Sequence, residues 1–121
     1  IGYLAPYISE ISEKMCFLLE DDGFEIGAAA TFGEGRDSIV GCIHPQSILD
    51  AIDAIISSAT TPLDAIFISC TSLKCATIIA IAEAQYGIPV ISSNSAIAWD
   101  MARLARLAML ANEKGLLFQQ N

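Results

Sequence analysis

Hydrophobic periodicity changes character repeatedly along this chain and always in the same order: a short apolar run is followed by a longer segment with helical spacing. The short runs lie within residues 1–5, 24–32, 64–70 and 89–91. In these runs apolar residues follow one another without alternating with polar ones, which is typical of strands buried on both faces. The sequence therefore predicts an α/β fold, a three-layer Rossmann-like lobe whose mainly parallel four-stranded sheet carries helices on both faces.

Four segments with helical spacing separate or follow these runs. The first begins at Ile8, and its apolar residues are expected to form a buried face. These residues are Ile8, Ile11, Met15, Leu18 and Leu19. Pro45 begins the second helix, and residues 73–86 form the third. Polar residues 92–94 cap the fourth helix, which is expected to run to about Leu110.

The length of the chain and the order of these elements indicate one domain. With 121 residues the chain can bury roughly two thirds of the surface of its unfolded state. We expect residues 1–110 to form one lobe, while the tail of residues 111–121 carries no clear signal. The chain opens on Ile1 rather than Met and reaches its first strand at once, so we expect it to be a piece of a longer polypeptide.

Charge and apolar content argue against several classes of protein. The chain has 6 Lys+Arg against 14 Asp+Glu and a formal net charge of −8, so it lacks the basic face that nucleic acid or an anionic membrane surface requires. Hydrophobic residues make up 54%, too many for a disordered chain. No uncharged stretch reaches the roughly 18 to 20 residues of a membrane span, and no signal peptide is visible. We therefore expect a cytoplasmic protein with neither membrane nor nucleic acid among its partners.

Four cysteines, Cys16, Cys42, Cys70 and Cys75, are separated by 26, 28 and 5 positions. Zinc sites use pairs about two to four residues apart, so this spacing predicts no metal site. Without a secretory signal the thiols are expected to be reduced. The glycines at 33–35 lack the third glycine of a dinucleotide-binding turn, and the chain has no phosphate-binding loop. We therefore expect no cofactor.

Cys70 is the residue with the most specific chemistry. It ends an apolar run, and the next helix is expected to begin with Thr71 and Ser72 directly after it. Ligands of parallel sheets bind at the carboxyl ends of the strands, where helix N-termini offer free N–H groups. There the helix dipole and the adjacent amides favour a thiolate, which lowers the pKa of a cysteine into a reactive range. The alternative is a structural cysteine buried in the core, one of the commonest buried residue types.

Three motifs occur in the same order as in a known group of enzymes. They are the segments 4–7 (LAPY) before a helix, 68–73 (ISCTSL), and 89–94 (PVISSN) followed by Ala98-Trp99. Together they resemble the aspartate/glutamate racemase superfamily, within it the branch of maleate cis-trans isomerase and arylmalonate decarboxylase. The resemblance spans about residues 1–108 and corresponds to the second, C-terminal lobe of those enzymes. They consist of two similar α/β lobes, and one cysteine from each lobe faces the other across a cleft.

The resemblance implies roles for four residues. Cys70 matches the second-lobe cysteine, which works as an acid/base thiol. Tyr7 matches the tyrosine whose hydroxyl helps to hold a substrate carboxylate, and the backbone amide of Thr71 matches a donor to that same oxyanion. Asp37 stands near a substrate-binding asparagine of the isomerases, and a carboxylate there would repel a dicarboxylate. The first-lobe cysteine, the nucleophile of the isomerases, has no counterpart in these residues.

The chain is therefore expected to be the C-terminal lobe of a cofactor-independent isomerase that uses cysteine chemistry on a small carboxylic or dicarboxylic acid. Residues 70–72 (CTS) resemble the isomerases more than the decarboxylases, in which glycine follows this cysteine. Arylmalonate decarboxylase-like or racemase activity is the enzymatic alternative, and a lobe that binds a small acid without turnover, or an assembly domain, is the non-catalytic one. The expected partners are the small carboxylate, the missing N-terminal lobe and further copies in a homo-oligomer. The isolated lobe is expected to be inactive.

Overall fold

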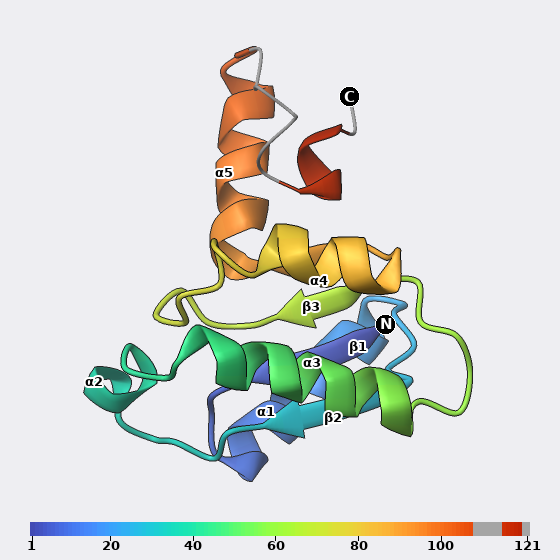
Figure 1. The fold of residues 1–121 in the computed structure, drawn as a ribbon, viewed down its shortest axis with the longest axis vertical. Helices are drawn as coiled ribbons and strands as arrows, with labels where there is room; N and C mark the ends of the chain where they lie inside the picture. Colours follow the sequence, from blue (N-terminus) through green and yellow to red (C-terminus); the bar gives the residue numbers. More distant parts are fainter. Residues whose placement is uncertain (108–114, 120–121) are drawn as a thin grey trace.

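Four short strands form one sheet in the computed structural model, which describes residues 1–107 and 115–119 (Figure 1). The strands are β1 (Gly2–Ala5), β2 (Ala28–Thr31), β3 (Ile66–Ile68) and β4 (Val90–Ser92). Their order is β2-β1-β3-β4, and all three neighbouring pairs are parallel. The predicted α/β fold with a four-stranded parallel sheet is thus confirmed.

The helices begin and end where local sequence chemistry favours it. They are α1 (Ser9–Asp21), α2 (Asp37–Val40), α3 (Pro45–Ser58), α4 (Ile79–Tyr86), α5 (Ser93–Leu104) and the 3-10 helix η2 (Leu116–Gln119). Pro45 is the first residue of α3, and the backbone N–H of Gln46 donates to His44 Nδ1 at 3.2 Å. Ser92 and Ser95 cap α5 reciprocally. The expected end of this helix at Leu110 lies outside the described residues.

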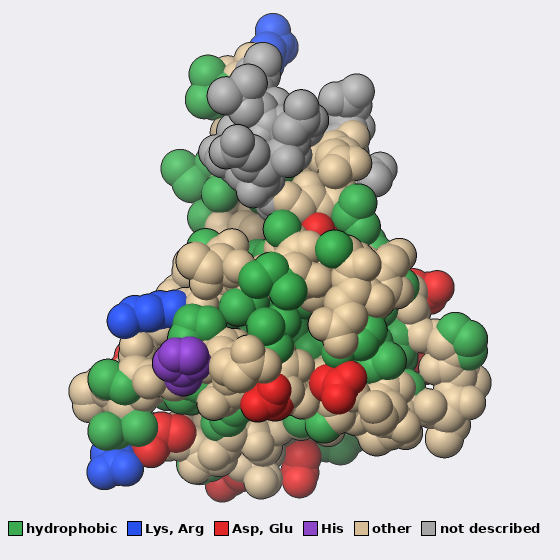
Figure 2. Space-filling view, viewed as in Figure 1, with side chains coloured by type: hydrophobic (Ala, Val, Ile, Leu, Met, Phe, Trp, Pro, Cys, Tyr) green, Lys and Arg blue, Asp and Glu red, His purple; other side chains and the backbone are tan. Residues whose placement is uncertain are grey.

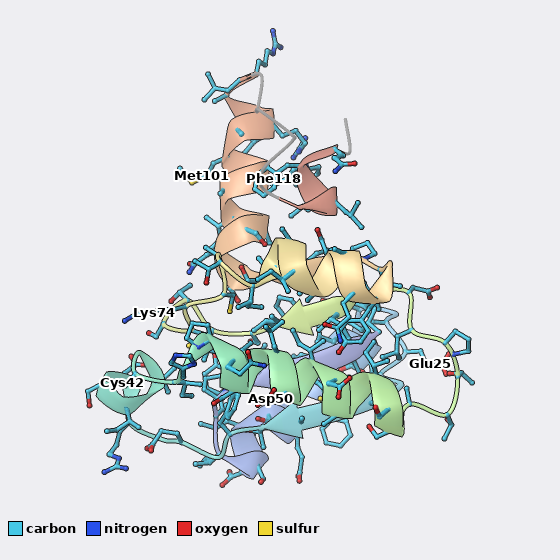
Figure 3. The ribbon with its side chains drawn as sticks, viewed as in Figure 1. Glu25, Cys42, Asp50, Lys74, Met101 and Phe118 are labelled. Atoms are coloured by element: carbon cyan, nitrogen blue, oxygen red, sulfur yellow. The ribbon has the colours of Figure 1, made fainter. Side chains whose placement is uncertain are left out.

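Helix α5 extends away from the sheet, and η2 returns beside it (Figure 1). Phe118 of η2 is buried, and Figure 3 shows it between η2 and α5. Across the described part of the chain, no helix combines the length and the apolar character needed to cross a membrane.

One face of the sheet is closed by α3 and α4. The apolar stripe of α3 points inward, whereas Figure 2 shows acidic side chains on its outer surface. Side chains of alternate residues along the strands meet this stripe and the inner side of α4. The resulting core includes Leu4, Val40, Ile48, Ile52, Ile55, Ile66, Ile68, Leu73, Cys75, Ile79 and Val90. We call this side of the molecule the closed face.

The opposite side, which we call the open face, is covered by α1 through small residues. Ser12 is the buried residue of α1, whereas Ile11 and Leu18 are 45% and 59% exposed. The prediction that the apolar residues of this helix form its buried face is therefore wrong. The rings of Tyr3 and Phe67, with centroids 6.2 Å apart, already occupy part of this face of the sheet. A helix can approach such a surface with its small residues, and its large apolar residues then point outward.

A candidate active site at the carboxyl ends of the strands

The backbone holds Cys70 firmly between β1, β3 and α5. The residue follows β3, is 8% exposed and has a φ of 127°, a conformation that costs a non-glycine residue about 1 to 3 kcal/mol. Its N–H donates to Ser93 Oγ at 3.1 Å, and the N–H of the preceding Ser69 donates to the carbonyl of Leu4 at 2.8 Å. Strain of this kind is typical of residues whose position is fixed by function.

The segment after Cys70 is a loop rather than a helix. Helix α4 begins at Ile79, so the prediction that Thr71 and Ser72 start the helix is wrong. The reason lies in the core: Leu73 and Cys75 are both buried although they are only two residues apart, which one helical face does not allow. Activation of the thiol by a helix N-terminus therefore has no basis in this structure. The sulfur instead accepts a hydrogen bond from the N–H of Ser72 at 3.4 Å and also interacts with the Tyr7 hydroxyl.

Tyr7 lies beside Cys70, at the end of β1. Burial raises the pKa of the Tyr7 hydroxyl, the nearby Ser69 hydroxyl acts in the opposite direction, and the neighbouring Cys70 thiol adds to the increase. The phenol is therefore a neutral hydrogen-bond donor at physiological pH. Its own backbone carbonyl accepts hydrogen bonds from the hydroxyls of Thr31 and Ser12, which fix the turn between β1 and α1.

Asp37 begins α2 and shares a cavity of about 180 Å³ with Tyr7. Its charge also contributes to the raised pKa of the phenol. The neighbouring Glu34 binds Arg36 through two hydrogen bonds of 2.9 and 3.0 Å. This contact lowers the pKa of Glu34 to about 2. Tyr7 therefore lies close to both Asp37 and Cys70.

Thr71 directly follows Cys70 but opens onto a different and larger cavity of about 680 Å³. Its side chain is exposed, and its carbonyl accepts a hydrogen bond from Asn94 Nδ2 at 2.9 Å. Lys74 lies at the tip of the same loop, and Figure 3 shows it at the same end of the molecule as Cys42, which follows α2. The loops after β1, β3 and α2 therefore converge at the end of the sheet where the sequence predicts a site.

The sequence interpretation missed two buried hydroxyl groups next to these residues. Ser69 is buried and interacts with both Tyr3 and Tyr7. Burial raises the pKa of Tyr3 to about 12, and its hydroxyl has no hydrogen-bond partner among the described residues. Ser69 and Tyr3 are each a polar residue in an otherwise apolar strand segment, and this feature of the sequence could have indicated both.

Cys70 and Cys75 both belong to the buried core cluster, but Cys70 is the one that lies beside Tyr7. All four cysteines are free. Cys75 is buried in the core of the closed face, which raises its pKa to about 11. Within residues 1–107 and 115–119 no group of three or more His, Cys, Asp or Glu side chains is arranged to hold a metal ion. The chemistry that the site can supply is that of one thiol with hydroxyl and amide donors around it.

The comparisons with known proteins agree with this architecture. Residues 2–118 match the profile of a family described as arylmalonate decarboxylase. A curated maleate isomerase of Nocardia farcinica (strain IFM 10152) is 28% identical over 122 aligned positions, which cover 100% of this chain and 47% of that protein. The chain thus spans about half the length of the curated relative that it matches.

Solved structures give the same result. The maleate cis-trans isomerase of Nocardia farcinica bound to TRIS superimposes with a TM-score of 0.91 at 26% identity, covering 98% of this chain and 48% of that one. A variant of it with one cysteine replaced by serine, which carries a covalently bound succinylcysteine intermediate, gives 0.89 at 25% identity and covers 99% and 48%. Arylmalonate decarboxylase shares the fold, with a TM-score of 0.84 at 24% identity over 99% of this chain and 54% of that structure.

Proposed function

The chain belongs to the arylmalonate decarboxylase family, and we propose that it is the C-terminal lobe of a cofactor-independent isomerase that acts on a small unsaturated carboxylic acid. Cys70 is its acid/base thiol, and Tyr7 and the backbone amide of Thr71 hold the substrate carboxylate. The four free thiols suit a reducing compartment, so the proposal places the enzyme in the cytoplasm.

The observation that carries this proposal is the placement of Cys70 next to Tyr7. Cys70 has a strained backbone conformation, and hydrogen bonds from its own N–H to Ser93 Oγ and from the N–H of Ser69 to Leu4 fix the direction in which its thiol can approach a substrate. A neutral phenol beside it can donate a hydrogen bond to a carboxylate that binds between them. The isomerase of Nocardia farcinica carries its succinylcysteine in a variant that lacks one cysteine, so a different cysteine of that enzyme bears the adduct. This supports a division of labour between two thiols.

The proposed reaction follows from that division. A cysteine supplied by the other lobe adds through its thiolate to one carbon of the double bond, and the electron pair moves into the adjacent carboxylate as an enediolate. Tyr7 and the amide of Thr71 stabilise this oxyanion, while the Cys70 thiol gives its proton to the neighbouring carbon. After rotation about the new single bond, the Cys70 thiolate takes a proton back and the carbon–sulfur bond breaks. The product is the geometric isomer, and both thiols are restored.

Uncovered apolar side chains around the site support the need for a second lobe. Ile8 and Ile11 are exposed next to Tyr7. Ile97 and Met101 are exposed on α5, whose first residue contacts Cys70. A lobe that brings a second cysteine over Cys70 would cover the side chains next to Tyr7, and one that also reaches along α5 would cover Ile97 and Met101. Exposed apolar surface of this kind marks an interaction site.

Decarboxylation is the second candidate, favoured by the family match. In that reaction the same oxyanion site stabilises the enediolate left by loss of carbon dioxide, and Cys70 protonates it. The two reactions separate in one assay, since a decarboxylase releases carbon dioxide from a substituted malonate and an isomerase changes only the geometry of a double bond.

The test replaces Cys70 in the complete protein that contains this chain. We expect Cys70→Ser to lower kcat for isomerisation of maleate or its monoamide by about 10² to 10⁴-fold, since it removes an acid/base group. The matched control is Cys42→Ser, which removes an exposed thiol and should change kcat less than about twofold. Equal activity of the two variants would contradict the proposal.

A further inference from the structure

We propose that Asp37 sets the substrate class of this site: the acid that binds here carries a hydrogen-bond donor, a carboxamide or an ammonium group, at its second end in place of a second carboxylate. The inference rests on the proposed function, in which Tyr7 and the loop after β3 hold the first carboxylate.

Tyr7 contributes to two neighbouring environments. It lies next to Cys70, and it also lines the cavity of about 180 Å³ whose wall includes Asp37. A small acid that is bound at Tyr7 and extends from Cys70 toward Asp37 therefore places its far end at this cavity. The group at that end decides whether the cavity accepts the molecule.

The charged side chains that line this cavity are hydrogen-bond acceptors. Together with Tyr7 and Gly35 the lining consists of the carboxylates of Glu34 and Asp37 and of the apolar side chains Ile8, Ile11 and Val40. Neither a lysine nor an arginine lines it among the described residues. The second carboxylate of a diacid would thus meet acceptors and hydrocarbon but no donor with a positive charge.

Arg36 does not supply the positively charged donor that this cavity lacks. Its guanidinium binds both oxygens of Glu34, and its side chain is 72% exposed. This pairing neutralises Glu34 and leaves the charge of Asp37, which belongs to none of the ion pairs of the described residues. A carboxamide or an ammonium group donates to such a carboxylate in a charge-assisted hydrogen bond, whereas a second carboxylate is repelled by it.

The experiment measures binding separately from turnover. The complete protein with Cys70→Ser serves as an inactive receptor, and calorimetry at pH 8 compares maleate with its monoamide. We expect the monoamide to bind at least about tenfold more tightly. Asp37→Asn in the same background should reverse this preference or abolish it, because the carboxamide of Asn also offers donors to a carboxylate. Asp64→Asn, an exposed change at the opposite end of β3, should leave the ratio unchanged.

Two outcomes overturn the inference: maleate binding as tightly as the monoamide, or Asp37→Asn leaving the ratio unchanged. Steady-state KM values of the unmodified enzyme give a second reading of the same ratio, should the serine variant fail to fold. Failure of the proposed function looks different, because a complete protein that prefers the monoamide in binding but isomerises neither compound supports the selectivity and contradicts the isomerase.

Discussion

The two faces of the sheet differ in how they are covered by the apolar side chains of their helices. On the closed face, Ile48, Ile52 and Ile55 of α3 are fully enclosed against the strands. On the open face, α1 presents small polar residues to the sheet and leaves Leu18 exposed to solvent. Large apolar side chains of α3 lie inside on the closed face, whereas large apolar side chains of α1 lie outside on the open face. Both helices nevertheless have apolar residues at helical spacing.

An amphipathic pattern in a sequence therefore reflects which side chains are buried in the whole protein, not which are buried within one lobe. The large apolar side chains of the closed face are buried within this chain. The open face has exposed apolar side chains, which the second lobe of the proposed enzyme would cover.

The most direct test deletes one side chain on each face. Ile52→Ala should lower the free energy of unfolding of this chain by about 2 to 5 kcal/mol, because it leaves a cavity in an enclosed core. Leu18→Ala removes an exposed side chain and should change it by less than about 0.5 kcal/mol. Urea denaturation measures both values. Similar losses for the two variants would mean that the faces do not differ.

Glycine substitutions compare the filled space under the closed face with the open space around a loop at the candidate site. A Cβ atom on Gly2 would lie 2.5 Å from Ile66 Cδ1 and 2.7 Å from Ile55 Cγ2, so Gly2→Ala should cost about 1 to 3 kcal/mol through overpacking. At Gly35 the nearest atom is Ile8 Cγ2 at 3.7 Å, an ordinary contact, and Gly35→Ala should be close to neutral. The prediction fails if thermal unfolding shows equal shifts for both.

Alkaline pH should reveal the buried phenol of the open face. The pKa of Tyr3 is about 10 in the unfolded chain and about 12 in the folded one. The folded state therefore keeps a proton that the unfolded state loses, and stability is complete below pH 10 and declines as the pH rises to 12. We expect this decline to be smaller in Tyr3→Phe by about 1 to 3 kcal/mol. Parallel pH profiles of unfolding for the two proteins would contradict this origin.

The smallest effect concerns the start of α5. Ser92→Ala removes the side chain that accepts from the N–H of Ser95 at 3.1 Å and should cost about 1 kcal/mol. The cap lies close to the proposed site, since Ser92 and Ser95 line the cavity onto which Thr71 opens. Urea denaturation of the variant and of the unchanged chain measures this loss.

Local signals explain what the sequence predicts correctly. The apolar runs define the four strands, Pro45 begins α3, and Ser92 caps α5. These features depend on residues within a few positions of each other. The order of strand and helix then leaves a parallel sheet as the simplest arrangement.

The wrong predictions concern features that depend on residues far apart in the sequence. The start of α4 moves to Ile79 because the core takes up both Leu73 and Cys75. Which side of α1 faces the sheet depends on the rings that already occupy the sheet. The periodicity of the helix sequence alone does not predict this. The cavity shared by Tyr7 and Asp37 joins two loops about 30 positions apart, and no local pattern predicts their contact.

The reactivity of Cys70 tests the central claim most directly. Iodoacetamide at pH 7 is added to the complete protein, and mass spectrometry follows alkylation of Cys70 against that of the exposed Cys42. We expect saturating monoamide to suppress the alkylation of Cys70 and to leave that of Cys42 unchanged. Alkylation of Cys70 that is insensitive to the acid would contradict its place in the substrate site.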